Sequence, residues 1–194
     1  MKLGRIALAA AFALIAGCGT SPKERYYTLS AAEAPAGTGQ AKAAYTVAVG
    51  PVTVPAAVDR FQIVLRVEAN RVEVNDLHRW AEPLRRAIPR VVASNLAREL
   101  GTARVVVYPP GGSEVADYRV FLDLSRFESE AGKAVTIEMA WSIRRGAGGE
   151  LRTGSSVVRE PVAGSGYELL VAAHSRALDT VSREIADALR AMSR

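Results

Sequence analysis

The sequence predicts an α+β domain, in which a mostly antiparallel sheet of six or seven strands carries two helices on one face. The first observation behind this prediction is a pair of segments, 118–125 and 135–144, in which apolar and polar residues alternate. Turn-forming residues join the two segments, so together they predict a long antiparallel hairpin. The second observation is a pair of longer segments, 82–100 and 165–192, whose apolar residues recur at helical spacing. Each helix has one apolar stripe to bury, and a sheet provides the surface for it.

The remaining strands are shorter, and proline, glycine or asparagine residues bound them. We expect these strands over residues 45–55, 61–67, 71–75, 104–108 and 151–161. Pro83 suits the first turn of the first helix, whereas Pro89 predicts a kink or a break near residues 85–88. Ser165 and Glu168 have the spacing of a capping box, which predicts where the last helix begins.

The composition excludes several kinds of site. The chain has 194 residues, of which 49% are hydrophobic, and this is enough for one packed α+β domain over residues 45–194. A single cysteine excludes an internal disulfide framework, and two histidines exclude a histidine-rich metal cluster, so we expect no metal and no cofactor. The formal charge is +5, but Lys2 and Arg5 contribute two of these charges and lie in a segment that we predict is removed. The small remaining excess gives no indication of a nucleic-acid partner.

The N-terminus has the anatomy of a secretory signal peptide over residues 1–17. A short basic head precedes an apolar run from Ile6 to Ala16, which is too short to cross a bilayer as a helix, since that takes about 20 residues. The run ends at Ile15-Ala16-Gly17-Cys18, which resembles the bacterial lipobox. In that motif, small residues let the scissile bond enter the protease, and the cysteine accepts a diacylglycerol before its new amino terminus is acylated. We therefore predict that Cys18 is lipidated.

The alternative is an ordinary signal peptide with an incidental cysteine, but the only cysteine of the chain lies where the apolar run stops. Several acyl chains hold a protein stably at a membrane, whereas a single chain binds marginally. Gly19 follows the cysteine, and an aspartate there would resemble the inner-membrane retention signal. We therefore expect the outer membrane, with the domain on its periplasmic face. Residues 18–44 are rich in small residues and proline and predict a flexible tether, in which Tyr26-Tyr27-Thr28-Leu29 is the exception that docks or forms a short edge strand.

The sequence offers no recognisable catalytic residues, so we do not expect an enzyme. His78 lies in a predicted loop before Trp80, and His174 lies on the apolar stripe of the last helix, where a histidine is more often a core residue than a general base. The sequence contains no nucleophile elbow, HExxH motif or phosphate-binding loop. Asp117 and Asp123 share one face of a predicted strand, but about 20 Å separates them, which is too far for an acid–base pair.

Two arginine pairs, Arg85-Arg86 and Arg144-Arg145, leave two interpretations open. They form either a basic surface for anionic lipid headgroups or an acidic partner, or ordinary solvated faces of the fold. The second interpretation is favoured, because arginines lie mostly on solvated surfaces.

Several short motifs agree, in order and in spacing, with those of one known family across nearly the whole mature chain. These are Tyr26-Tyr27-Thr28-Leu29, Val49-Gly50-Pro51-Val52 with Pro55, Asp59-Arg60, Gln62-Ile63-Val64, Arg79-Trp80-Ala81-Glu82-Pro83-Leu84, Asn95-Leu96, Arg126-Phe127-Glu128, Trp141, and Leu170 with Ala172, Ala173 and Ser175. The chain thus resembles the ABC-type transport auxiliary lipoproteins, also called the PqiC-like lipoproteins. Two residues depart from the family pattern, namely Phe61, where the family usually has proline, and Pro89. These departures concern the local structure at each position and not the resemblance to the family.

This resemblance implies a non-enzymatic periplasmic component of a lipid-transport system that joins the two membranes of the envelope. The implied partners are ABC transporter or permease subunits and an MCE-domain protein, which is anchored in the inner membrane and builds a tunnel across the periplasm. The lipoprotein is expected to receive the far end of that tunnel, and family members can form homo-oligomeric rings. Arg79, Trp80 and Glu82 are the candidate contact residues, because Trp and Arg dominate interface hot spots. Alternatively, they have a structural role and cover the edge of the sheet.

Two other functions stay open on the sequence. A periplasmic carrier of lipid or of another small ligand needs a concave apolar pocket, and aromatic residues make up only 6% of the chain, so the sequence shows no surplus of bulky residues beyond the core. A hydrolase needs His78 or His174 as its general base.

Overall fold

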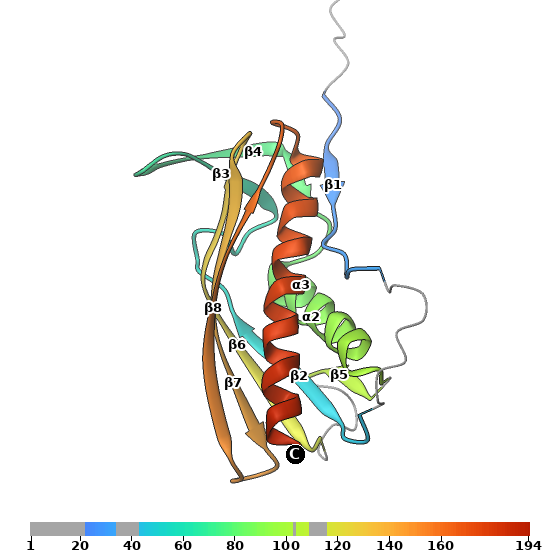
Figure 1. Cartoon of the computed structure of the whole chain (residues 1–194). Coiled ribbons are helices and arrows are strands. Elements are labelled where there is room, and N and C mark those ends of the chain that lie inside the picture. The colour runs from blue at the N-terminus through green and yellow to red at the C-terminus, as the bar shows by residue number, and fades with distance from the viewer. Residues whose placement is uncertain (1–21, 34–42, 103, 109–115) are drawn as a thin grey trace, which may run out of the picture.

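The computed structural model describes residues 22–33, 43–102, 104–108 and 116–194. These ranges contain eight strands and two helices, which are labelled in Figure 1. In chain order they are β1 (Arg25–Tyr27), β2 (Val47–Thr53), β3 (Gln62–Glu68), β4 (Arg71–Trp80), α2 (Leu84–Leu100), β5 (Val105–Val107), β6 (Tyr118–Glu130), β7 (Ala134–Arg145), β8 (Leu151–Pro161) and α3 (Tyr167–Met192). One sheet with two helices is an α+β fold, as the sequence predicts.

The two alternating segments form the predicted hairpin, in which β6 and β7 pair antiparallel along their length. β8 continues the antiparallel arrangement on the far side of β7. The apolar residues of β6 and β7 are buried and alternate with more exposed ones. The period of two in the sequence therefore predicts both the strands and the face that meets the helices.

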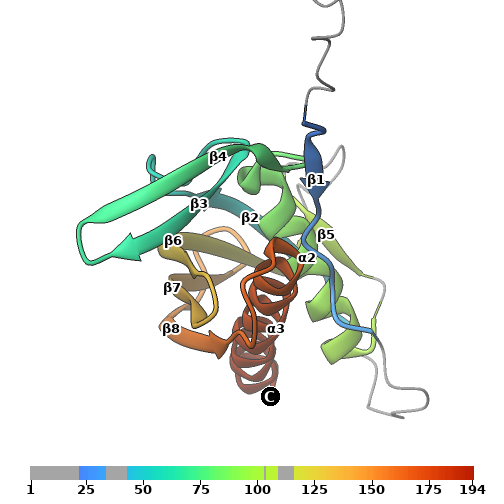
Figure 2. The same ribbon diagram turned by 90° about the horizontal axis from the view of Figure 1, so that it is seen from above.

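The other edge of β6 is shared by two strands. β2 runs parallel to the first half of β6, where Val47 pairs with Tyr118, and β3 meets the second half, where Leu65 pairs with Ser129. β5 extends the sheet beyond β2, whereas β4 and then β1 extend it beyond β3. The sheet is therefore forked, and the hairpin of β3 and β4 projects from it (Figure 2).

This sheet corrects the prediction of a mostly antiparallel sheet of six or seven strands. It has eight strands, and four of its seven strand pairings are parallel. Alternation along a strand shows which side chains are buried, but it carries no information about which strand lies alongside. The connection from β2 to its parallel neighbour β5 includes α2, and parallel neighbours require a long crossover of this kind.

Both helices pack on the same side of the sheet, as the sequence predicts. α3 lies along β7 and β8, and α2 lies against β2 and β5 (Figure 1, Figure 2). The two helices also contact each other, so the hydrophobic core lies between the helical layer and the inner face of the sheet. Leu96, Leu178 and Ile185 are fully buried there, and burial of each such side chain contributes about 1.5–3 kcal/mol.

The proline in the first helix does not break it. α2 continues as one helix from Leu84 to Leu100 through Pro89, so the predicted break near residues 85–88 is wrong. Proline removes one intrahelical hydrogen bond. The helix face that includes Pro89 is buried against the sheet, and this burial offsets the loss.

The last helix begins without the predicted capping box. α3 starts at Tyr167 with Gly166 as its N-cap residue, and no side chain caps it. Ser165 and Glu168 therefore do not form the reciprocal pair that their spacing suggests. The Glu168 carboxylate instead lies 3.8 Å from the guanidinium of Arg25, in β1.

Candidate functional site: the docked leader segment

Residues 22–33 lie against the domain, and we call them the leader segment. Its first part is β1, which joins the edge of the sheet as a parallel neighbour of β4, with Tyr27 opposite Trp80. The pairing continues beyond the strand, because the Ala81 amide donates a hydrogen bond to the Tyr27 carbonyl (2.8 Å). Residues 26–29 were predicted either to dock or to form an edge strand, and the structure shows both.

Beyond β1, the leader segment passes from the sheet edge to the two helices. Leu29 is only 1% exposed and belongs to the hydrophobic core. The Ser30 amide donates a hydrogen bond to the Ser175 hydroxyl on α3 (3.2 Å). The Ala32 amide donates one to the side-chain oxygen of Asn95 on α2 (3.0 Å). The Arg90 guanidinium on α2 also donates a hydrogen bond to the Leu29 carbonyl (3.2 Å), so one apolar side chain, two hydrogen bonds to α2 and one to α3 hold this part of the chain.

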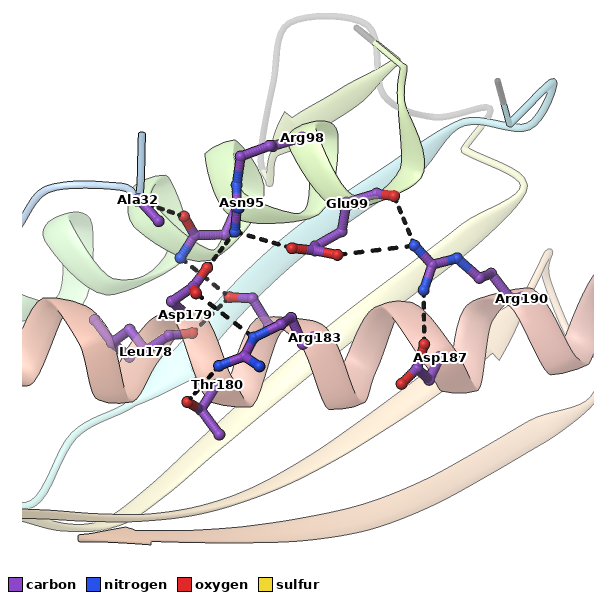
Figure 3. A network of polar contacts seen from close by, with 11 residues as sticks. Ala32, Asn95, Arg98, Glu99, Leu178, Asp179, Thr180, Arg183, Asp187 and Arg190 are labelled. Carbon is purple, nitrogen blue, oxygen red and sulfur yellow. Dashed lines mark hydrogen bonds and ion pairs between the residues drawn. The ribbon is translucent and has the colours of Figure 1, made fainter. Parts of the chain in front are cut away.

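Behind the leader segment, a polar network joins α2 to α3 (Figure 3). Asn95 is a buried member of this network. The Asn95 amide nitrogen donates a hydrogen bond to the Ser182 hydroxyl (3.4 Å), and the Asn95 side-chain oxygen accepts one from the leader segment. Arg98 on α2 pairs with Asp179 on α3, which adds an ion pair across the helix interface. The charged members of the network are Arg98, Glu99, Asp179, Arg183, Asp187 and Arg190. Asn95 therefore ties the leader segment to the same helix pair that the ion pairs hold together.

Asn95 and Ser175 occur in the sequence motifs, but the sequence pattern assigned neither residue a role. Both are buried, with exposed fractions of 0% and 9%, on helix faces that are otherwise apolar. A buried polar side chain is costly without a hydrogen-bond partner. A polar residue on an apolar helix face therefore indicates that a hydrogen-bond partner lies there, but it does not identify the leader segment as that partner.

Aromatic and charged side chains fill the angle between β1, β4 and the start of α3. The Tyr27 hydroxyl lies 2.7 Å from His78 Nδ1, and the His78 ring stacks on Tyr167 with 3.7 Å between ring centroids. Burial, together with the positive charge of Arg25, lowers the pKa of His78, and burial raises the pKa of Tyr27. The Glu168 carboxylate accepts a hydrogen bond from the Tyr27 hydroxyl (3.4 Å). These contacts fix the first turn of α3 on the leader segment.

The three residues predicted to contact a partner or to have a structural role lie beside the leader segment. Trp80 is 4% exposed and packs edge-on against two rings of the core. Arg79 pairs with Glu24 of the leader segment (2.8 Å), and Glu82 pairs with an arginine of α2. Trp80 therefore packs behind β1, and Arg79 holds the leader segment itself.

His78 and Trp80 lie at the end of β4 and not in the loop that the sequence predicts. β4 extends over ten residues to Trp80, whereas the pattern predicts that the strand ends at Asn75. Polar residues interrupt the alternation after that point. The segment nevertheless stays extended, because β1 pairs with its last three residues on one side and Gln62 of β3 pairs with Arg79 on the other.

The second histidine, His174, is fully buried and stacks on Phe127 with 3.9 Å between ring centroids. Its Nε2 lies 2.8 Å from the hydroxyl of Ser129, which is only 3% exposed. Burial lowers the pKa of His174 to about 3, so the ring is neutral in the folded protein near pH 7. A substrate in solution does not reach this pair, and the geometry agrees with a core residue.

Positively charged residues gather at the opposite end of the long strands. Arg119 on β6 pairs in register with Arg144 on β7, and Arg145 follows. Among the residues that the structure describes, these three form no ion pair, and Arg119 and Arg145 lie instead over the rings of Tyr108 and Tyr118. Arg119 and Arg145 also line a surface pocket of about 530 Å³. Like charges directly opposite each other destabilise a sheet, so an anionic group at this end would stabilise it.

Within the described ranges, no group of three or more His, Cys, Asp or Glu residues is placed to hold a metal ion. No helix in those ranges is long and apolar enough to cross a membrane. Cys18 and the predicted signal peptide lie outside the described residues, as do residues 34–42 of the predicted tether.

The sequence as a whole identifies the family. The family model for the ABC-type transport auxiliary lipoprotein component matches residues 27–186, which reach from β1 into the last turns of α3. The chain belongs to this family. The match confirms the resemblance drawn from the motifs, and it makes the protein an auxiliary lipoprotein component of ABC-type transport. No curated protein is detectably similar to this auxiliary lipoprotein.

Solved structures share the fold of this auxiliary lipoprotein. A crystal structure of an uncharacterized protein has a TM-score of 0.71 at 20% sequence identity, over 87% of this chain and 99% of that chain. Protein XCC0632 from Xanthomonas campestris, of family DUF330, has a TM-score of 0.67 at 19% identity, over 83% of this chain and 92% of that chain. Identities this low show the fold alone. A PelC dodecamer from Paraburkholderia phytofirmans has a TM-score of 0.45 at 14% identity, over 76% of this chain and 92% of that chain.

Replacing Leu29 by serine should release the leader segment. The side chain is 1% exposed, and loss of its burial removes about 2 kcal/mol of docking free energy, which raises the undocked population about 30-fold. The rate of trypsin cleavage after Arg25, which the pairing of β1 protects, measures this population. Thr28→Ser changes the exposed neighbouring position and should be cleaved like the wild type. Equal cleavage of Leu29→Ser and the wild type would contradict the docking.

His174 should make the stability of the protein depend on pH. Its pKa of about 3 in the folded protein lies below the ordinary value of 6.5, so the unfolded chain binds a proton that the folded protein excludes. The free energy of unfolding should be highest above pH 6.5 and should fall by up to about 1.4 kcal/mol per pH unit towards pH 3.

Urea unfolding at several pH values, from about pH 5 to about pH 7.5, measures this slope. His174→Gln should lose the slope whatever its absolute stability, because it removes the titrating group. His78→Gln is the control and should keep most of the slope, since His78 is only partly buried. A slope that persists in His174→Gln shows that other groups cause it.

Proposed function

We propose that the protein is a non-enzymatic lipoprotein on the periplasmic face of the outer membrane, where it serves an envelope lipid-transport system. In this proposal Cys18 carries the lipid anchor. The domain holds an MCE-domain protein, together with its ABC transporter or permease subunits, at that membrane. Membership of the family supports the transport role, and the docked leader segment is the observation that carries the docking role.

The leader segment supports a docking role because it limits how far the domain stands from its anchor. Only residues 19–21 separate Cys18 from the first residue of the leader segment. A free tether over residues 18–44 would let the domain move widely, whereas a docked segment shortens the free chain. A domain held close to the bilayer is suited to receive a partner that reaches across the periplasm.

We place the partner at the end of the domain that lies farthest from the leader segment. β7 has 12 residues and spans about 40 Å, from the end near the start of α3 to the end with Arg144 and Arg145. The facing pair Arg119 and Arg144 lies at this far end. A partner surface rich in carboxylates would neutralise these charges, which fits an interface held by charge complementarity.

Affinity capture of the full-length protein, after crosslinking in intact cells, tests the transport role. We expect mass spectrometry to identify an MCE-domain protein or an ABC transporter subunit among the recovered partners. Cys18→Ser should leave the membrane fraction and lose these partners, because it lacks the anchor. Recovery of the acylated wild type without any such partner would count against the proposal.

Arg119→Glu should separate partner binding from stability. It replaces two opposed positive charges by a cross-strand ion pair with Arg144, worth about 0.2–1 kcal/mol, and it removes the contact of Arg119 with the Tyr108 ring, which is of similar size, so the free energy of unfolding should change by less than about 1 kcal/mol in urea unfolding. Partner recovery should nevertheless fall, because the new charge repels carboxylates. Arg71→Glu, at the exposed tip of the β3–β4 hairpin, is a charge reversal remote from the basic end; it breaks the exposed ion pairs with Glu68 and Glu73 but should keep full recovery. Normal recovery with a folded Arg119→Glu of near wild-type stability would exclude the basic end as the docking surface.

A second candidate function is a periplasmic carrier of lipid or of a small ligand. The observation in its favour is an open groove of about 390 Å³ on the sheet, whose lining includes Pro51, Phe121 and Trp141. Native mass spectrometry of Cys18→Ser, which lacks its own acyl chains, distinguishes the two functions. A copurified acyl ligand would favour the carrier function. Protein without any bound ligand would exclude the carrier function.

A further inference from the structure

We infer that one end of this domain rests directly on the lipid surface. This end, which we call the membrane-facing end, consists of the β6–β7 turn (residues 130–133), the loop before α3 with its first turn (residues 163–169), and residues 25 and 26 of the leader segment. The inference rests on the proposed lipidation of Cys18. Beyond the lipid anchor, the inference states which side of the domain meets the bilayer.

Chain length decides which end lies near the bilayer. Cys18 precedes Arg25 by seven residues, so even a fully extended chain spans at most about 25 Å between them. Arg25 is fixed on the domain, because it pairs with His78 in β4 and lies beside Glu168 in the first turn of α3. α3 has 26 residues and is about 39 Å long. The chain between Cys18 and Arg25 is therefore too short to let the far end of α3 face the membrane.

Hydrogen bonds join the segments of the membrane-facing end into one surface. The Gly132 amide of the β6–β7 turn donates to the Gly164 carbonyl (3.1 Å), and the Val162 amide donates to the Lys133 carbonyl (2.9 Å). These two loops lie at the end of the molecule where α3 and β1 begin (Figure 1). The ion pair of Arg25 with Glu168 adds the leader segment, so the surface is built from three parts of the chain that hold one another in place.

The exposed side chains of this end suit the boundary between lipid and water. Leu169 is 45% exposed and Tyr26 is 60% exposed, and an aromatic ring with a hydroxyl group favours the headgroup region. Arg25 and Lys133 are exposed nearby and can contact lipid phosphates. Because the acyl chains supply the anchoring energy, these weak contacts only have to orient the domain.

Two exposed alanines provide matched probes for the test. Ala131 lies in the turn before β7 and Ala147 in the turn after it, so the length of β7, about 40 Å, separates the two turns. Lipidation consumes the thiol of Cys18, so Ala131→Cys or Ala147→Cys adds the only free thiol for a fluorophore. The acylated variants are reconstituted in vesicles of phosphatidylethanolamine and phosphatidylglycerol that carry nitroxide-labelled headgroups.

We expect the fluorophore at residue 131 to lose most of its emission and the fluorophore at residue 147 to keep it. A flexible Gly/Ser insertion of about 20 residues between Ser21 and Pro22 should reduce this difference, because the longer chain no longer restricts the orientation. Equal quenching at both positions without the insertion, or stronger quenching at residue 147, overturns the inference.

Flotation of the same vesicles separates this inference from the proposed function. Protein that floats with the vesicles but is quenched equally at both positions refutes the orientation and leaves the anchor intact. Protein expressed with its signal peptide that carries no acyl group and does not float refutes the lipid anchor, and the orientation with it.

Discussion

The parallel pairing of β1 with β4 is the interaction on which the rest of the site depends. A strand of three residues is not stable alone, so its backbone hydrogen bonds persist only because neighbouring contacts hold both ends. Leu29 is buried just after the strand, and the Glu168 carboxylate contacts the strand itself. In return, β1 covers the free edge of the last residues of β4, whose other edge is paired with the start of β3, and Trp80 lies there in the core. The leader segment and the domain therefore stabilise each other.

The sequence predicts the local elements of this fold well and their arrangement less well. The alternation in residues 118–125 and 135–144 identifies the central hairpin, and the helical stripes identify both helices and their buried faces. The order of the strands in the sheet is not predicted, because the pairing of β2 with β6 joins segments that no local pattern connects. The end of β4 was missed for the same reason, since it is paired with β1 on one side and with the start of β3 on the other.

The candidate site was predictable to a similar degree. The motif at residues 26–29 marked a segment that docks, and the position of His174 on an apolar stripe indicated a core histidine. The roles of Asn95 and Ser175 depend on backbone amides more than 60 residues away in the chain, so sequence spacing does not show them. The opposition of Arg119 and Arg144 likewise depends on the register of the hairpin, which a count of charges does not contain.

The contact between Ser30 and Ser175 joins residues that are 145 positions apart in the chain. The N-terminal member leaves the ribosome long before the helix that it binds. Contacts of such long separation form late in folding, because a large loop must close first. A molecule truncated before α3 lacks the contacts with Ser175 and Glu168, so only the sheet edge and α2 hold its N-terminal segment, which is more open to proteases. Protection of this segment therefore reports that the chain has been made at least as far as α3.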